Sequence, residues 1–77
     1  MERQNVISKT IKSIGYENGK LEIEFHPSKN SRDAVGSIYQ YENVPQDTFQ
    51  KMRVSPSMGE ALTNLVKKPG YSYKRIL

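Results

Sequence analysis

The fold is predicted by residues 11–26, which read IKSIGYENGKLEIEFH. The Asn-Gly pair at 18–19 favours the positive φ values of a two-residue type I′ turn, whose twist suits a β-hairpin. After the turn, apolar and polar residues alternate, so Leu21, Ile23 and Phe25 share one face of an extended strand. We therefore expect two antiparallel strands joined by a tight turn, with one buried face and one solvated face.

A third strand is predicted over residues 37–43, where Tyr39 and Tyr41 are alternate residues and point to one face. Residues 27–36, which separate this strand from the hairpin, are mostly polar and are predicted to be a loop insert. Because strands that are adjacent in sequence usually pair, the three strands should form an antiparallel meander. The register, which decides which face of the sheet carries the two tyrosines, is left open.

The hydrophobic period changes after the third strand. Pro45 followed by Asp47 is typical of a first helical turn, where an acid suits the positive end of the helix dipole. Further on, Ser57 and Glu60 form a capping-box pattern, and Pro69-Gly70 ends a second helix. The apolar residues of the second helix recur at helical spacing: Met58, Ala61, Leu62, Leu65 and Val66.

Together, these elements predict one α+β domain over residues 1–77. Residues 71–77 should add a short final strand or an ordered tail, so we expect a three- to four-stranded antiparallel sheet. Two short helices should pack on one face of this sheet. The predicted core combines the apolar face of the hairpin with one face of each helix: Leu21, Ile23, Phe25, Phe49, Met52, Leu62 and Leu65.

The composition excludes several kinds of site. The chain has no cysteine, which excludes disulfides, zinc–thiolate sites and thiol nucleophiles. His26 is the single histidine, and no pattern of a catalytic triad or a metal pair surrounds it. Glu22 and Glu24 alternate with core residues, so they are expected on the solvated strand face. We therefore expect no enzyme activity, no metal and no cofactor.

The composition also bears on location. No apolar run approaches the ~20 residues of a membrane-spanning helix, so no membrane partner is expected. A small secreted domain would usually carry disulfides, which favours the cytoplasm. The oligomeric state is left open.

The net charge of +4 is distributed unevenly. Residues 1–44 carry six Lys or Arg and six Asp or Glu, whereas residues 45–77 carry six Lys or Arg and two acids. An excess of one sign in one portion of a chain suggests a surface that faces a polyanion. Ordinary solvated lysines are the alternative.

The best candidate site is the basic and aromatic segment at residues 67–75, which holds four cations, two tyrosines and no acid. Such interleaving suits a phosphate backbone with stacked bases. The alternative is a helix end with favourable lysines followed by a closing strand. Tyr39 and Tyr41 join this site if their rings are exposed, and the core if they are buried. The candidate binding residues are Tyr39, Tyr41, Lys67, Lys68, Tyr71, Tyr73, Lys74 and Arg75.

Several short motifs occur in a definite order: Gly15-Tyr16, Leu21-x-Ile23-x-Phe25, Gly36-x-x-Tyr39-x-Tyr41-x-x-Val44-Pro45, Ser57-x-Gly59 and Tyr71-x-Tyr73-Lys74-Arg75-Ile76. In order and spacing, over residues 3–76, they resemble the KTSC domain, whose hallmark is a central Tyr-x-Tyr. The resemblance implies a small free-standing bacterial or phage protein similar to the C-terminal domain of some lysyl-tRNA synthetases. It also carries a suggestion of RNA binding.

The chain departs from this family pattern at two places. Residues 27–35 stand where the family usually has a tight turn. Glu60-Ala61-Leu62 replaces an aromatic pair that often follows the Ser-x-Gly motif. The loop insert is therefore a candidate for a role particular to this protein.

These observations lead to one main functional prediction and two alternatives. The main prediction is a non-catalytic module that binds RNA or another polyanion through its basic and aromatic segment. One alternative is a protein-interaction module, including a phage protein that engages a host factor, because function concentrates in loops such as the insert. The other is a small-nucleotide binder, which would use the same basic residues.

Overall fold

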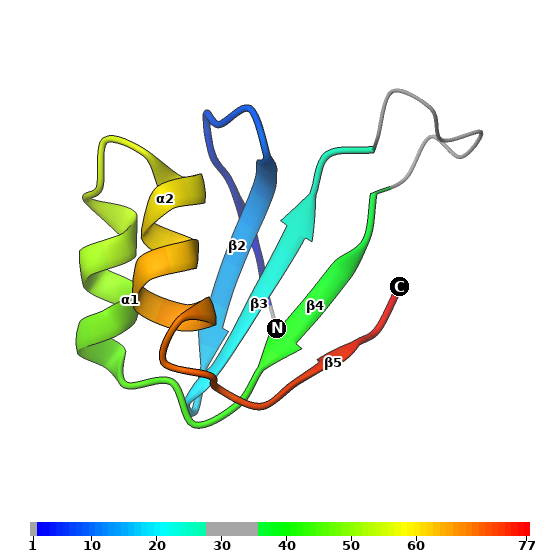
Figure 1. The fold of residues 1–77 in the computed structure, drawn as a ribbon. Helices are drawn as coiled ribbons and strands as arrows, with labels where there is room; N and C mark the ends of the chain where they lie inside the picture. Colours follow the sequence, from blue (N-terminus) through cyan, green and yellow to red (C-terminus); the bar gives the residue numbers. More distant parts are fainter. Residues whose placement is uncertain (1, 28–35) are drawn as a thin grey trace.

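The fold is an antiparallel sheet with helices on one side, in a computed structural model that describes residues 2–27 and 36–77 (Figure 1). Within these residues, five strands pair in sequence order: β1 (Gln4–Asn5), β2 (Ile11–Glu17), β3 (Lys20–Phe25), β4 (Ile38–Tyr41) and β5 (Tyr73–Arg75). The helices are α1 (Gln46–Arg53), α2 (Met58–Leu62) and the π-helical turn η1 (Thr63–Lys67), which continues α2. Figure 1 shows α1 and α2 side by side, with β4 and β5 extending away from them. The predicted α+β class, antiparallel sheet and pair of helices are confirmed.

The predicted number of strands was too low, because β1 was not expected. Gln4 lies opposite Ile14, and Asn5 lies opposite Ser13, in an antiparallel pair at the β2 edge of the sheet. Two polar residues have no apolar alternation, so no local pattern marks them as a strand. They become one because the edge of β2 offers backbone hydrogen-bonding groups that need partners. The final strand, which the sequence allowed, is β5.

The predicted hairpin is confirmed as β2 and β3. Asn18 and Gly19 both have positive φ, at 51° and 80°. This is the turn geometry that the Asn-Gly pair favours. Leu21 and Ile23 are fully buried, as their alternation predicts.

The register between β3 and β4 decides the position of the two central tyrosines. Leu21 pairs with Tyr41, and Ile23 pairs with Tyr39. Directly opposed residues point to the same face of a sheet, so both tyrosines lie on the apolar face, the side of the sheet that carries the helices. Tyr41 is only 4% exposed, while Tyr39 is half-buried.

The helices begin largely where the sequence predicts. Pro45 is the N-cap residue of α1, and Ser57 caps α2, its side chain accepting a hydrogen bond from the Glu60 N–H at 3.4 Å. The last turn of the second helix is wider than an α-helical turn. The backbone N–H of Lys68 donates to the oxygen of Thr63 at 2.9 Å, which is the i→i+5 spacing of a π-helix.

The core lies between the helices and the sheet. Most of the predicted core residues belong to it, with Leu21, Ile23, Met52 and Leu62 buried. Phe25, Phe49 and Leu65 pack against it while partly buried. The predicted loop insert at residues 27–36 falls mainly on residues 28–35, which lie outside the described part of the chain.

Candidate functional site

A groove of about 520 Å³ opens on the helix side of the sheet, where β3, β4 and β5 extend past the helices. Its lining comprises Phe25, Tyr39, Tyr41, Lys67, Gly70, Tyr71 and Tyr73. Five of these seven residues are aromatic, and one is a lysine. We call this feature the aromatic groove.

The sheet register assembles most of the groove. Tyr41 lies opposite Tyr73 across the β4–β5 pair, and the same face of β3 carries Phe25. Gly70, with φ of 83°, reverses the chain between η1 and β5. A left-handed backbone is easy only for glycine, so Gly70 allows the chain to turn back and place Tyr71 at the groove.

Four of the five aromatic rings of the groove contact one another in series. Phe25 and Tyr39 meet edge to face, with centroids 5.8 Å apart and an interplanar angle of 80°. Tyr39 and Tyr73 meet at 5.8 Å and 63°, and Tyr41 and Tyr73 at 5.5 Å and 42°. Edge-to-face and tilted pairs suit the quadrupoles of the rings. The series runs from Phe25 through Tyr39 and Tyr73 to Tyr41. Tyr41 at its end is buried, whereas Tyr73 beside it is 63% exposed.

A cation lies over this aromatic surface. The Nζ atom of Lys67 is 5.7 Å from the centroid of the Phe25 ring, within the range of a cation–π interaction. Lys67 is the last residue of the π-helical turn. The neighbouring Lys68 is exposed and is not part of the groove lining.

The structure brings together five of the eight predicted site residues: Tyr39, Tyr41, Lys67, Tyr71 and Tyr73. Arg75 pairs with Tyr39, so it stands beside the groove on the same face. Lys74 pairs with Gln40 and therefore points to the opposite face. Lys68 and Lys74 thus lie outside the groove, because helix and strand periodicity direct adjacent residues differently.

Phe25 and Gly70 are parts of the site that the sequence does not predict. The alternation of β3 places Phe25 on the correct face, but only the β3–β4 register shows that it meets Tyr39. Pro69-Gly70 predicts the end of the second helix, and the helix does end just before this pair. The contribution of Gly70 to the groove depends on where the following strand pairs.

Tyr41 is held neutral by its surroundings. Burial raises the pKa of its phenol above the ordinary value of 10.0, and negative charge on the neighbouring Tyr73 and Tyr39 would raise it further. A neutral phenol provides aromatic surface and a hydroxyl group, not a base or a nucleophile. Tyr41 therefore acts in the groove as a packing surface.

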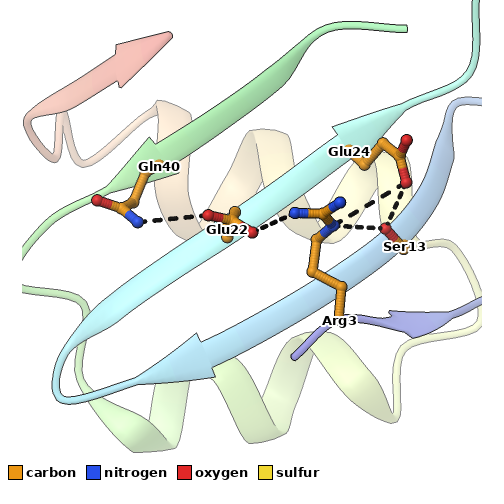
Figure 2. Close-up of polar contacts among 5 residues, drawn as sticks. All are labelled: Arg3, Ser13, Glu22, Glu24 and Gln40. Carbon is orange, nitrogen blue, oxygen red and sulfur yellow. Dashed lines mark hydrogen bonds and ion pairs between the residues drawn. The ribbon is translucent and has the colours of Figure 1, made fainter. Parts of the chain in front are cut away.

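The opposite face of the sheet carries a polar network around Arg3 (Figure 2). The guanidinium group donates to a Glu22 carboxylate oxygen through Nη1 and to Ser13 Oγ at 3.1 Å through Nε. The Ser13 hydroxyl donates to Glu24 Oε1 at 2.8 Å, and the Gln40 amide donates to Glu22 Oε1 at 3.4 Å. Two carboxylates thus share one guanidinium, which leaves this network negatively charged.

This network corrects the expected solvation of the strand face. Glu22 is only 5% exposed, because Arg3 and Gln40 lie on either side of its carboxylate. Burial of a charge is tolerated where it is paired and hydrogen-bonded. The two glutamates are therefore structural partners of Arg3, Ser13 and Gln40.

The described residues include neither a cluster of metal ligands nor a membrane-spanning helix. No group of three or more His, Asp or Glu side chains that could hold a metal lies within residues 2–27 and 36–77. His26 is exposed, with its Nε2 atom 3.0 Å from the backbone oxygen of Ser8. In the same described portion, no helix is both long and apolar enough to cross a membrane.

A five-stranded antiparallel sheet with helices on one face and a tyrosine-lined groove defines a small α+β domain. The model of the KTSC domain matches residues 7–71, and the chain belongs to the KTSC domain family. It is similar to a KTSC domain protein from Yersinia pestis whose crystal structure is known. That structure has a TM-score of 0.78 and 33% identity, covering 99% of this chain and 97% of that one. Among curated proteins, the comparison found no match.

Proposed function

We propose that this protein is a non-catalytic binding module for single-stranded RNA, with bases against the aromatic groove and phosphate at its rim. The observation that carries the proposal is that Lys67 and five aromatic residues line one groove. Every base has a π face, so an aromatic surface binds bases with little regard to sequence. A lysine beside the rings supplies the charge that the phosphate requires.

The distribution of charge over the sheet supports this face over the other. Lys67 lines the groove, and Arg75 stands beside it, opposite Tyr39. On the other face, Arg3 and Lys74 are matched by Glu22 and Glu24, so these residues give that face no excess of positive charge. A polyanion should therefore approach the groove side.

The proposal accords with the lysyl-tRNA synthetase and RNA associations that the family resemblance suggested. It places the protein in the cytoplasm of a bacterium or of a phage-infected cell, where RNA is abundant. The protein-interaction alternative rests on residues 27–35, nearly all of which lie outside the described residues.

The proposal is tested by fluorescence anisotropy with a labelled single-stranded RNA of mixed sequence, titrated at low and moderate salt. Combined Lys67→Gln and Arg75→Gln substitutions should flatten the slope of log affinity against log salt by about 1.4, at ~0.7 per phosphate contact. The matched control changes Lys12 and Lys20 to Gln, which removes equal charge away from the groove.

The control pair should change the slope much less. Absence of binding at low salt would refute the proposal, since electrostatic affinity is greatest there. Equal effects of the two pairs would show diffuse binding that does not use the groove.

A further inference from the structure

We infer that the aromatic groove holds a single nucleotide unit, with one base stacked on Tyr73 and one phosphate at Lys67. This inference rests on the proposed function, because it concerns the same groove. It specifies the ligand as a planar base that carries one phosphate, and not as a tract of several stacked bases.

The first argument is the exposure of the rings. Tyr73 is 63% exposed, whereas Tyr41 is 4% exposed and the other three rings of the groove are half-buried. Tyr73 contacts the rings of Tyr39 and Tyr41, yet it keeps most of its surface exposed, which Phe25 and Tyr39 do not. A base needs a free ring face for stacking, so one ring can receive one base. RNA-binding sheets that hold several bases typically stack two or three of them on aromatic side chains.

The second argument is the supply of charge. Among the described residues that line the groove, Lys67 is the single cation. Arg75, the next cation on this face, stands outside the groove lining, where it can meet the phosphate of a neighbouring nucleotide in a strand. A lysine ammonium is a compact point charge suited to one phosphate group. The groove therefore supplies one cation, which can pair with one phosphate group.

The third argument is size. The groove volume of about 520 Å³ lies in the range of roughly 300–1,000 Å³ that is typical of small-ligand sites. Gly70 has φ of 83° and no atom within 4 Å of the position that a Cβ would take. The rim at Gly70 is therefore open, which leaves room for a sugar or for continuation of a strand.

Two sources could provide this ligand: a free nucleoside monophosphate, or an unpaired nucleotide within an RNA strand. Both present the same base and phosphate to Tyr73 and Lys67. The two sources are distinguished by competition between them.

The experiment follows the amide signals of the ¹⁵N-labelled protein by NMR during titration with AMP, UMP, adenosine or inorganic phosphate. AMP and UMP should shift signals of residues 67–75 and β4 with saturation. Adenosine and phosphate should each bind at least tenfold more weakly, because each lacks one half of the ligand. AMP should also displace the labelled RNA, with one nucleotide bound per domain.

Matched variants separate the two contacts. Tyr73→Leu should weaken AMP binding about tenfold or more, whereas Tyr73→Phe should retain it, because stacking requires only the ring. Lys67→Gln should weaken binding of AMP more than of adenosine. Lys68→Gln is the control, because Lys68 carries the same charge at the adjacent position but does not line the groove. The amide spectra report whether each variant is folded.

The outcomes distinguish this inference from the proposed function. If RNA binds but neither AMP nor UMP binds or competes, the single-nucleotide inference is wrong and the RNA proposal stands. If AMP binds and RNA does not, the ligand is a free nucleotide and the RNA proposal fails. If neither binds, both fail. Equal losses in Lys67→Gln and Lys68→Gln, or in Tyr73→Leu and Tyr73→Phe, would overturn the assignment of the contacts.

Discussion

At the residue scale, Tyr41 belongs both to the core and to the wall of the aromatic groove. Its ring is packed in the hydrophobic cluster and tilted against Tyr73 at 5.5 Å. Burial disfavours its ionised form and raises its pKa. The unfolded chain has no such burial, so the two states bind protons differently at alkaline pH.

This difference predicts an alkaline loss of stability that depends on Tyr41. Above pH ~10, where an unperturbed tyrosine ionises, the unfolded state releases the proton before the folded state does. The free energy of unfolding should therefore fall as pH rises from 10 toward the raised pKa of Tyr41. Urea unfolding at pH 8 and pH 11 should show a larger loss for the wild type than for Tyr41→Phe. Parallel losses in the two proteins would contradict the prediction, since both contain the same lysines.

At the element scale, β1 is too short to be held by its own backbone pairing alone, and the side chain of Arg3 attaches it to the sheet. It consists of two residues, Gln4 and Asn5, at the edge of the sheet. Arg3, which precedes it, crosses β2 to reach Glu22 on β3 (Figure 2). The strand is thereby attached to the middle of the sheet and not only to its neighbour.

Arg3→Met should destabilise the protein by about 2 kcal/mol, because it leaves the buried Glu22 carboxylate without its charged partner. The estimate is below the 3–5 kcal/mol typical of fully buried pairs, since the Arg3 side chain is 28% exposed. Urea unfolding measures the change. The double variant Arg3→Met with Glu22→Gln should recover part of the loss, because a carboxamide buries no charge. A double variant no more stable than Arg3→Met would show that the ion pair is not the cause.

At the scale of the whole molecule, the helices cover only part of the sheet. Figure 1 shows α1 and α2 near β2 and β3, with β4 and β5 extending beyond them. Tyr16 on β2 stacks on Phe49 of α1 with centroids 4.9 Å apart, which fixes the helices at that side. The aromatic groove exists because the apolar face continues onto β4 and β5 where no helix covers it.

The packing of the helices on the sheet can be tested at Leu62, the last residue of α2, whose side chain is buried in the core with 2% exposed. Leu62→Ala should lower the free energy of unfolding by about 2–5 kcal/mol, through lost burial and the cavity that remains. Leu65→Ala is the matched control, and its effect should be smaller because Leu65 is only partly buried. A thermal melt that shows no loss for Leu62→Ala would mean that the helix is not packed on the sheet as described.

Sequence reasoning succeeded where the physical signal is local. The Asn-Gly turn requires two adjacent residues with positive φ, and Ser57 caps α2 through a residue three positions away. Such local patterns can be recognised in the sequence without knowledge of the rest of the fold. The π-helical turn was not predicted, because the i→i+5 bond from Lys68 to Thr63 leaves no mark in the apolar spacing.

The sequence by itself therefore determined the hairpin, the two helix starts, the α+β class and the basic, aromatic character of residues 67–75. The tertiary structure decided the register that pairs Leu21 with Tyr41, and with it the face on which the central tyrosines lie. It also recruited Phe25 to the groove and separated Lys67 from Lys68 and Lys74. The physical reason is the separation along the chain of the residues that interact. Turns and caps are fixed by neighbours a few residues apart, whereas strand register and groove lining depend on packing between segments that are distant in the chain.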